Sequence, residues 1–405
     1  MSVRFLHTAD LHLGSRMNSL EDRAGDFRET LLRSFENLLD LATKLDVSLL
    51  LIAGDFIEMN EIKDREIQRI AELLCRERSF YVLLAAGNHD PYTAASAYAE
   101  QLNDIAGFHI FSAETVERVD FPELDLSIYG TSFASLYQSE TMLPLPEKVT
   151  RIFTALDGQI IVTENDHVGQ NKVGLIHGTL LSGSASASRE DEVYNPIYDS
   201  HCKLLPFSYL ALGHIHKPSV LPELPTIDNK TIALYPGSPQ GISFNEQNER
   251  HALLVELEEG KIINIKPVNT ADRLFIDLTV DILKEDSDLM IQRKITQAAQ
   301  QRTGNHYARH AYRITLQGEC PEGFDSKSIT HALIDQFAYI KIKDRLKLPI
   351  DLAELRLENT LQGRFIDNLM TQYEATDEPI ERADIMRAIR IGLEAFAGEI
   401  LYNVD

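Results

Sequence analysis

Short apolar runs, each followed within a few residues by Asp, Asn or His, constrain the fold of this chain more than any other feature. The first three runs are Val3–His7, Val47–Ala53 and Phe80–Ala86. Their apolar residues are continuous rather than alternating, which is typical of strands covered on both faces. Apolar residues at helical spacing over 26–45 and 61–76 predict helices between the runs. This alternation of strands and helices predicts a layered α/β fold.

The rest of the chain first extends this pattern and then changes it. Further buried strands are predicted at Leu126–Thr131, Val173–Ile176, Tyr209–Leu212 and Ile232–Tyr235, and a hairpin at His251–Val268 with Glu259-Gly260 at its turn. Beyond residue 272 the pattern predicts a compact unit with strands at Leu274–Val280, Ala311–Leu316 and Ile340–Ile342 and helices at Ser287–Gln301 and Ser326–Phe337. Two helices are predicted after Pro349, over 361–374 and 380–402.

The polar residues that follow the runs predict one shared site. Asp10, Asp55, Asn88, His177 and His214 each lie one to four residues beyond an apolar run. In α/β sheets, ligands gather outside the carboxyl ends of the strands. Five separate strands would therefore deliver polar side chains to one edge.

The neighbours of these residues complete a candidate set of metal ligands. The set consists of Asp10, His12, Asp55, Asn88, His177, His214 and His216. Carboxylate, imidazole and amide groups favour manganese, iron or zinc over calcium, and the lack of cysteine in the set argues against a structural zinc. Two such ions about 3.5–4 Å apart can clamp a phosphate ester and acidify a water. The set therefore predicts a two-metal phosphoesterase.

Three residues have more specific predicted roles. Asp55 is the candidate for a carboxylate that bridges both ions. His89 is placed to stabilise or protonate the leaving oxygen, and Asp90 is a candidate to orient His89. Each motif alone is common, and Gly-Asn-His-Asp alone is typical of a turn. Their conjunction in order, each behind a strand, favours the metal site. His7, by contrast, is predicted to be a packed histidine.

Composition bounds the remaining possibilities. The chain has 39 basic and 62 acidic residues and a net charge of −23, which disfavours tight DNA binding by the chain alone, because such binding rests on lysine and arginine. The longest apolar run is far shorter than a membrane span, and the beginning of the chain turns polar too early for a signal peptide. Three scattered cysteines predict no disulfide framework, so the expected compartment is a reducing cytoplasm.

Five motifs together carry a family resemblance. They are Leu6-His-Thr-Ala-Asp-Leu-His-Leu-Gly14, Ala53-Gly-Asp55, Gly87-Asn-His-Asp90, His177-Gly and Gly213-His-Ile-His216. With them the sequence resembles the calcineurin-like metallophosphoesterases and, within these, the SbcD-type DNA repair exonucleases. Those are nuclease subunits that act with an SbcC or Rad-type ATPase. The Tyr235-Pro-Gly-Ser-Pro239 segment, with Ser243-Phe244 beyond it, is also similar to that branch, so the resemblance covers about residues 1–250.

The resemblance implies a layered metallophosphoesterase β-sandwich flanked by helices, with a smaller α+β capping domain and C-terminal helices. The implied domains are a nuclease domain over 1–270, a capping domain over 271–348 and a helical ATPase-docking region over 349–405. One ion would be held by Asp10, His12, Asp55 and His216, and the other by Asp55, Asn88, His177 and His214. His89 would be the catalytic histidine that binds no ion. Manganese is the expected metal, and relatives of this kind commonly form homodimers.

Two features depart from the family pattern. Some relatives carry a second catalytic histidine three residues after the bridging aspartate, where this chain has Glu58. Glu58 either tunes metal affinity, binds a further cation or faces solvent. Ser182–Ser188, followed by Arg189-Glu-Asp-Glu192, resembles an insertion after His177 and is either a gate or an ordinary loop.

Three functions follow as hypotheses. The first is a metal-dependent DNA exonuclease or endonuclease acting with an SbcC-like ATPase, with DNA approaching basic residues of the 341–347 segment and the Ile385–Ile400 stripe docking on the partner. The alternatives for these two features are a solvated strand edge and packing within the chain's own domain. The second function is a phosphatase or phosphodiesterase of nucleotides or small esters. The third is a non-catalytic DNA-end binding subunit, which retention of every ligand and of His89 disfavours.

Overall fold

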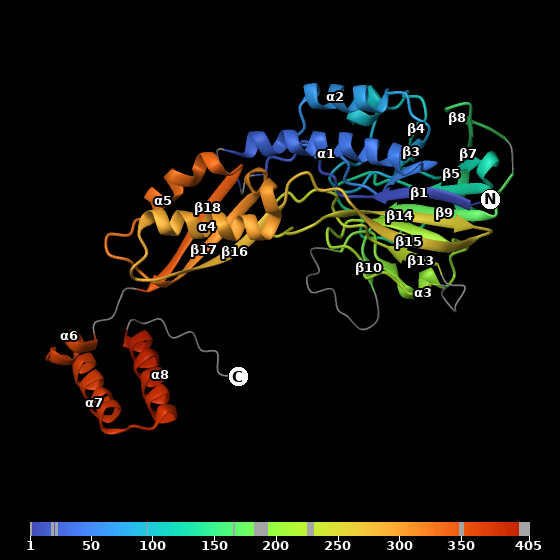
Figure 1. The fold of residues 1–405 in the computed structure, drawn as a ribbon. Coiled ribbons are helices and arrows are strands. Elements are labelled where there is room, and N and C mark those ends of the chain that lie inside the picture. The colour runs from blue at the N-terminus through green and yellow to red at the C-terminus, as the bar shows by residue number, and fades with distance from the viewer. Residues whose placement is uncertain are drawn as a thin grey trace. The chain divides into compact units, whose positions relative to one another are not determined.

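A mixed sheet with a parallel centre carries the first half of the site (Figure 1). The structure is a computed structural model that describes residues 2–17, 20, 23–94, 96–164, 167–181, 193–224, 231–347 and 352–396. The strands of this sheet run in the order β15 (Lys261–Asn269), β14 (His251–Glu258), β1 (Ser2–Thr8), β2 (Leu49–Ile52), β3 (Tyr81–Leu84) and β4 (Phe108–Ile110). Strands β1 to β4 are parallel, and Thr8, Ile52 and Leu84 pair at their carboxyl ends. The loops that follow these strands therefore start at one level.

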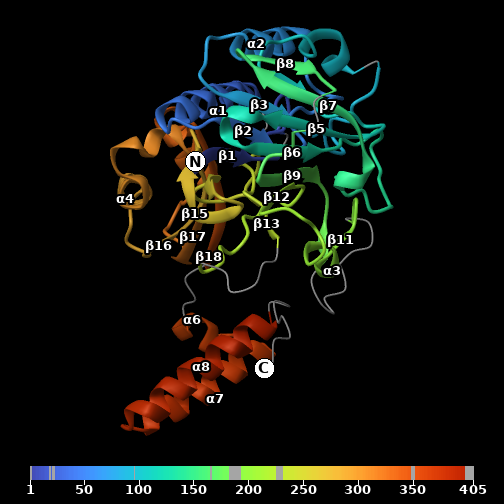
Figure 2. The ribbon, with the colours of Figure 1, turned by 90° about the vertical axis from the view of Figure 1, so that its right-hand side faces the viewer.

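A second sheet packs against the first and carries the other half of the site (Figure 2). Its strands run in the order β13 (Ile232–Leu234), β12 (Tyr209–Gly213), β9 (Asn171–His177), β6 (Leu126–Gly130), β5 (Val116–Phe121), β7 (Val149–Leu156) and β8 (Gln159–Val162). Strand β12 is parallel to β9, and Gly213 pairs with His177 at their carboxyl ends. The short strands β10 (Leu180–Leu181) and β11 (Ile197–Tyr198) pair beside this sheet and precede α3 (Asp199–Cys202).

Alternate residues of each strand enter different cores. Phe5 and Leu51 of the first sheet meet Val173 and Tyr209 of the second in the core between the sheets. Leu50 points the opposite way, into a core with the helices α1 (Ala24–Lys44) and α2 (Asp64–Leu74). Because both faces of these strands are covered, their sequences are continuously apolar. The predicted α/β layered fold, a β-sandwich flanked by helices, is confirmed.

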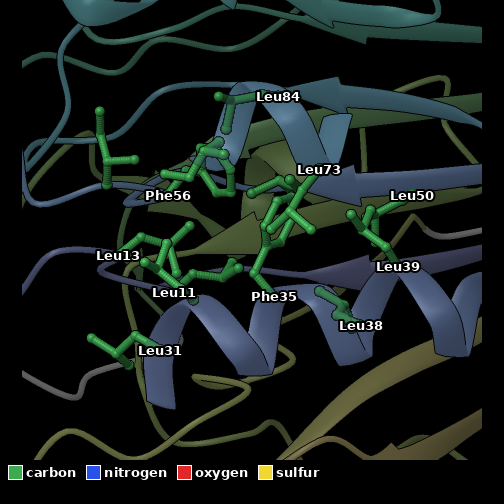
Figure 3. Packing of buried hydrophobic residues seen from close by; sticks show 14 of the residues in the cluster. Leu11, Leu13, Leu31, Phe35, Leu38, Leu39, Leu50, Phe56, Leu73 and Leu84 are labelled. Carbon is green, nitrogen blue, oxygen red and sulfur yellow. The ribbon is translucent and has the colours of Figure 1, made fainter. Parts of the chain in front are cut away.

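Helix α1 packs against the outer face of the first sheet (Figure 3). Leu31, Phe35 and Leu38 recur at helical spacing and are buried against the sheet. The Phe35 ring meets that of Phe56 at 5.0 Å between centroids, edge to face. Phe56 follows Asp55 directly, so this packing anchors the loop that carries the aspartate. Among the described residues, no helix is long and apolar enough to cross a membrane.

The chain forms two compact units. The first contains Met1–Leu278, Ala299–Ile314 and Leu333–Lys341, and the second contains Thr279–Ala298, Thr315–Ala332 and Ile342–Asp405. A third sheet, in the order β16 (Phe275–Ile282), β17 (Ala311–Glu319) and β18 (Tyr339–Lys347), is accompanied by α4 (Asp288–Thr303) and α5 (Ser326–Leu333). The predicted domain boundaries at 270 and 348 stay predictions.

The C-terminal helices form a small core of their own. These are α6 (Leu352–Leu357), α7 (Leu361–Ala375) and α8 (Pro379–Phe396). Ile385, Ile389 and Leu393 of α8 bury their side chains with Ile366 of α7. The described part of the predicted apolar stripe therefore packs within its own helices, which was the alternative to partner docking. Ile400, and the segment Ser182–Ser188 with its acidic continuation, lie outside the described residues.

Candidate metal centre

The loops after the strands hold their polar residues in unusual backbone conformations. Asp10, His12 and Asp55 have φ angles of 55°, 46° and 49°, and His214 has 108°. Residues other than glycine adopt this left-handed region at a cost of about 1–3 kcal/mol each, and such residues cluster at functional sites. The surrounding hydrogen bonds hold these conformations. Asp10 N donates to the carbonyl of Gly54 and His12 N to that of Asp55, at 3.0 and 2.9 Å.

Two glycines allow the loops of the two sheets to meet. A Cβ atom on Gly213 would lie 1.7 Å from the carbonyl oxygen of Ala53, and one on Gly54 would lie 2.3 Å from Nδ1 of His177. No side chain fits at either position without moving backbone or a site histidine. The glycines of the Ala-Gly-Asp and Gly-His-Ile-His motifs are therefore required by the contact between the sheets.

The loops bring most of the predicted ligands together. The described residues contain three groups of three residues, and within each group the ligand atoms lie within 4.8 Å of one another. The groups are Asp10 with His12 and His216, His12 with Asp55 and His89, and Asp10 with Asp55 and His177. Asp10, His12 and Asp55 each belong to two groups, so the groups form one continuous site.

One carboxylate oxygen lies between histidines from the two sheets. Oδ2 of Asp55 is 3.4 Å from Nε2 of His177 and 3.8 Å from Nε2 of His12. Nε2 of His12 in turn faces Nε2 of His216 at 3.1 Å. Nitrogen and oxygen lone pairs that converge in this way are typical of ligands for a shared cation.

Acceptors outside the site hold the histidine rings. Nδ1 of His177 donates to the Ala53 carbonyl at 2.9 Å, and Nδ1 of His216 donates to Oε1 of Glu246 at 2.8 Å. Each bond uses the proton on Nδ1, so Nε2 is the nitrogen that is directed into the site. Metal-binding histidines nearly always make such a bond through their other nitrogen.

His89 has a different environment from the other histidines of the site. Its side chain is 44% exposed, whereas those of His12 and His177 are 4% and 0% exposed. Its Nδ1 lies 2.9 Å from Oε2 of Glu58, and the same oxygen is 3.4 Å from Nδ1 of His12. The Glu58 carboxylate raises the pKa of His89 to about 9, mainly through this hydrogen bond. Glu58, which the sequence left between three roles, therefore contacts two histidines of the site.

Asp90 makes its described contacts with the loop rather than with the ring of His89. Its carboxylate accepts hydrogen bonds from the backbone N–H groups of Gly87 and Phe56, both at 2.6 Å, and from the hydroxyl of Tyr98. The bond to Gly87 closes the turn of the Gly-Asn-His-Asp motif, and the bond to Phe56 ties it to the Asp55 loop. The described hydrogen-bond partner of the His89 ring is Glu58. No described hydrogen bond joins Asp90 to that ring, so the predicted orienting role of Asp90 stays a prediction.

Asn88 and His214 border the three groups. Oδ1 of Asn88 lies 3.0 Å from Nε2 of His177. His214 donates its backbone N–H to the carboxylate of Asp10 at 2.9 Å, and its ring lies 5.2 Å from that of His177. Both residues are therefore beside the His177 group, where the second ion is predicted, although His214 is outside the three groups found among the described residues.

The span that contains these loops matches a known family. Residues 3–218 match the Calcineurin-like phosphoesterase family, which covers the motifs from Asp10 to His216. The chain belongs to the calcineurin-like phosphoesterase family. The predicted resemblance is confirmed, and the chain is a phosphoester hydrolase of a family that uses divalent metal ions.

Relatives of this calcineurin-like phosphoesterase include one protein named as a nuclease subunit and others named for DNA double-strand break repair. "Uncharacterized metallophosphoesterase YhaO" of Bacillus subtilis is 25% identical over 97% of this chain and 90% of the relative. "DNA double-strand break repair protein Mre11" of Sulfurisphaera tokodaii is 24% identical over 90% of this chain and 88% of the relative. One subunit of the nuclease SbcCD of B. subtilis is 25% identical over 60% of this chain and 63% of the relative.

The charges of this phosphoesterase site fit divalent cations. Burial alone would raise the pKa of Asp55, but the neighbouring histidines hold it below its ordinary value. Burial alone would lower the pKa of His177, but Asp55 outweighs it and raises the pKa of His177 to about 9. The pKa of His216 is raised against burial by Glu246. A site that draws protons this strongly has an excess of negative charge, and bound cations would neutralise it.

Three supporting residues of this phosphoesterase were missed at the level of sequence. Glu246 holds His216, Tyr98 holds Asp90, and Nδ2 of Asn195 donates to the His177 carbonyl at 2.7 Å. None lies at a recognisable spacing from the residue it supports. The nearby Tyr235-Pro-Gly-Ser-Pro239 segment was the one available signal for Glu246, because Ser238 donates to that carboxylate at 2.7 Å.

Proposed function

We propose that this chain is a divalent-metal-dependent nuclease that hydrolyses phosphodiester bonds in DNA and acts with an SbcC-like ATPase. The observation that carries the proposal is the position of Asp55 Oδ2 between His12 Nε2 and His177 Nε2, at 3.8 and 3.4 Å. One oxygen shared by two groups of ligand atoms is the arrangement that a bridging carboxylate needs.

For the two ions we propose the ligand sets that the family resemblance implies. Asp10, His12, Asp55 and His216 would hold one ion, and Asp55, Asn88, His177 and His214 the other, with manganese as the favoured metal. Two bound ions supply charge for the phosphate oxygens and acidity for the attacking water. The chain's own histidines keep their Nε2 atoms directed inward through the bonds from Nδ1 to Ala53 and Glu246.

His89 would act on the leaving group. It is the most exposed of the histidines compared above, so a substrate can reach it, and Glu58 fixes its ring through Nδ1. Its Nε2 is then available to donate a proton to the leaving oxygen. The exposure of His89 and its bond to Glu58 support this role, and its ring lies in one group with His12 and Asp55, close to the proposed ions.

DNA is favoured over small phosphoesters by two observations. One relative, which matches 90% of this chain, is named as a double-strand break repair protein. Another, which matches 60% of it, is named as a nuclease subunit. The chain also continues beyond the matched span into the third sheet, where Lys341, Lys343, Arg345 and Lys347 are all exposed on β18. We assign residues 1–270 to the nuclease domain and 271–348 to a DNA-capping domain.

The C-terminal helices are the proposed docking element for the ATPase, over residues 349–405. With the Ile385 stripe buried against α7, the candidate surface consists of the apolar side chains that these helices expose. Leu361, Ile380 and Ile391 are among them, at 75%, 78% and 53% exposure. These side chains are the candidates for contact with the ATPase, because an interaction surface is built from exposed apolar residues.

The test compares two substrates on the full chain. With manganese, we expect degradation of linear double-stranded DNA, increased by the co-expressed ATPase and abolished by a chelator. Bis(p-nitrophenyl) phosphate serves as the small diester. Turnover of this ester without any attack on DNA, with or without the ATPase, would reject the nuclease and favour the phosphodiesterase of small substrates.

A further inference from the structure

A cavity outside the metal centre carries a local excess of positive charge. It has a volume of about 310 Å³ and lies within the first unit of the chain. Its charged lining consists of Arg250, Arg302 and Arg309 against Glu249 and Asp272. The chain as a whole has a net charge of −23, so a cavity lined by three arginines differs in sign from the rest of the molecule.

One of the two carboxylates of the lining is already neutralised. Asp272 forms ion pairs with Arg309 and, at 2.9 Å, with Nε of Arg33 from α1. Glu249 is exposed at the rim. The described carboxylates that line the cavity therefore leave Arg250 and Arg302 without an ion pair to the lining.

Two arginines retain unused donors. Arg302 donates to Oδ1 of Asn248 at 2.8 Å and forms no ion pair with a carboxylate among the described residues. Arg250 is 8% exposed, and its Nε has no hydrogen-bond partner in the described part of the chain. That nitrogen is closed off from solvent, so Arg250 contributes positive charge to the cavity, and Arg302 contributes the accessible donors.

A neutral histidine adds a further donor. Leu274 N donates to Nδ1 of His310 at 3.1 Å, so the ring proton resides on Nε2. Burial, helped by the nearby Arg309, lowers the pKa of His310 to about 4. His310 therefore lines the cavity as an uncharged N–H donor that does not compete with the arginines for an anion.

The wall of the cavity is fastened by Pro239 and Gln240, the two residues that follow Ser238. Buried Gln240, just after Tyr235-Pro-Gly-Ser-Pro239, accepts hydrogen bonds from the backbone N–H groups of Asp272 and Arg273 at 2.9 and 3.1 Å. Thr270 donates through its hydroxyl to the Pro239 carbonyl at 2.7 Å. The 270–273 wall is therefore built before any ligand arrives.

The geometry points to a phosphate-binding pocket formed by Arg302, Arg309, His310 and Arg250. Guanidinium groups recognise phosphate oxygens through paired N–H donors. The phosphate belongs either to a DNA backbone or to a free phosphate or nucleotide. Only the first source rests on the proposed nuclease function.

The pocket shares Arg250 with the support of the metal centre. Nη2 of Arg250 donates to Oε2 of Glu246 at 2.9 Å, and Glu246 accepts the Nδ1 proton of His216. A phosphate in the pocket would therefore lie two side chains away from a proposed metal ligand. For this reason Arg250 is left intact in the test.

The test replaces Arg302 with glutamine and compares Arg293→Gln, an exposed arginine earlier on α4, as the matched control. The full chain is kept in a chelator so that ions bind no phosphate and DNA is not cut. Thermal unfolding is followed in sodium phosphate and in sodium chloride of equal ionic strength. We expect phosphate to raise the midpoint of the wild type and of R293Q, and to lose at least half of that effect in R302Q.

A second arm separates the two sources of phosphate. Binding of a short double-stranded DNA is measured as a function of salt, and loss of one backbone contact lowers the slope of log K against log salt by about 1. A lower slope in R302Q than in R293Q assigns the pocket to the DNA backbone. An unchanged slope with loss of the phosphate effect assigns it to free phosphate or a nucleotide.

Equal stabilisation of the wild type, R302Q and R293Q by phosphate, or no stabilisation of the wild type, would reject the proposed phosphate-binding pocket. A wild type that neither binds nor cuts DNA with manganese and the co-expressed ATPase would remove the proposed nuclease function, but the phosphate arm would still decide the pocket. The two inferences therefore fail separately.

Discussion

At the scale of single residues, exposure separates His89 from the histidines that it adjoins. Its side chain is 44% exposed and its Nδ1 is bound to Glu58. It can therefore contact substrate without removing a ligand from either proposed ion. We expect His89→Ala to lower kcat by about a hundredfold to ten-thousandfold, the usual contribution of a general acid. Manganese content, measured by elemental analysis, should stay at the wild-type level. Loss of metal in parallel with activity would make His89 a ligand.

Asp55 should behave in the opposite way. Its carboxylate belongs to both the His12 and the His177 groups, so Asp55→Asn removes the bridging charge from two sites at once. Manganese content and hydrolysis should then fall together. An Asp55→Asn chain that keeps full manganese occupancy would disprove the bridging role.

Glu58 is expected to position His89. Glu58→Gln removes the charge that orients the ring, and the loss of such an outer partner typically costs about 10–100-fold in activity or metal affinity. We expect kcat on DNA to fall in this range while KM changes little, since Glu58 fixes a ring rather than binding substrate. Glu72→Gln, an exposed glutamate on α2, is the matched control. A Glu58→Gln kcat equal to that of the control would show that Glu58 merely occupies space.

Sequence predicts the residues of the candidate metal centre better than the residues that support them. Asp10, Asp55 and His177 follow apolar runs, and this position marks them. Glu246 and Asn195 contact the histidines from distant segments, so their roles depend on how the two sheets pack. A single sequence carries no periodic signal for such a contact.

At the scale of elements, the ends of the parallel strands meet at glycine. A Cβ on Gly213 would lie 1.7 Å from the Ala53 carbonyl, and backbone cannot move away as a flexible side chain does. We expect Gly213→Ala to destabilise the chain by at least about 1–3 kcal/mol, the usual cost of overpacking, as measured by urea unfolding. Gly25→Ala on α1 meets nothing within 4 Å and should be neutral or stabilising by up to about 1 kcal/mol. Equal effects of the two changes would contradict the close contact.

The strands and helices that surround the site were largely predictable because their apolar patterns are strong. The predictions for β1, α1, β3 and β12 agree with the structure to within two residues at each end. Strand β5 was missed because its sequence, Val116–Phe121, is half charged although every residue is buried. Glu117 is compensated there by His109 at 3.1 Å and Arg151 at 3.2 Å, partners that no local pattern reveals. The predicted helix over 326–337 ends earlier, at Leu333, before a short 3₁₀ turn.

At the scale of the whole molecule, the C-terminal helices have a hydrophobic core that includes Ile366 and Ile389 and is their own. We therefore expect a chain that ends after Lys347 to keep its manganese-dependent hydrolysis of bis(p-nitrophenyl) phosphate. It should no longer co-purify with the co-expressed ATPase. A pull-down with tagged full-length and truncated chains measures this directly. Retained ATPase binding would place the docking surface outside 349–405, and loss of ester hydrolysis would make these helices part of the catalytic fold.

The loops that converge on the site come from two separate sheets, and this has a consequence for the lifetime of the protein. Ions bound by Asp55 of one sheet and His177 of the other would link the two sheets, since separating the sheets must release the ions. Such linkage adds about 2.7 kcal/mol when the free metal is a hundredfold above its dissociation constant. Scarcity of the metal would then do more than silence the enzyme. It would leave the idle chain easier to unfold and quicker to be cleared by proteases.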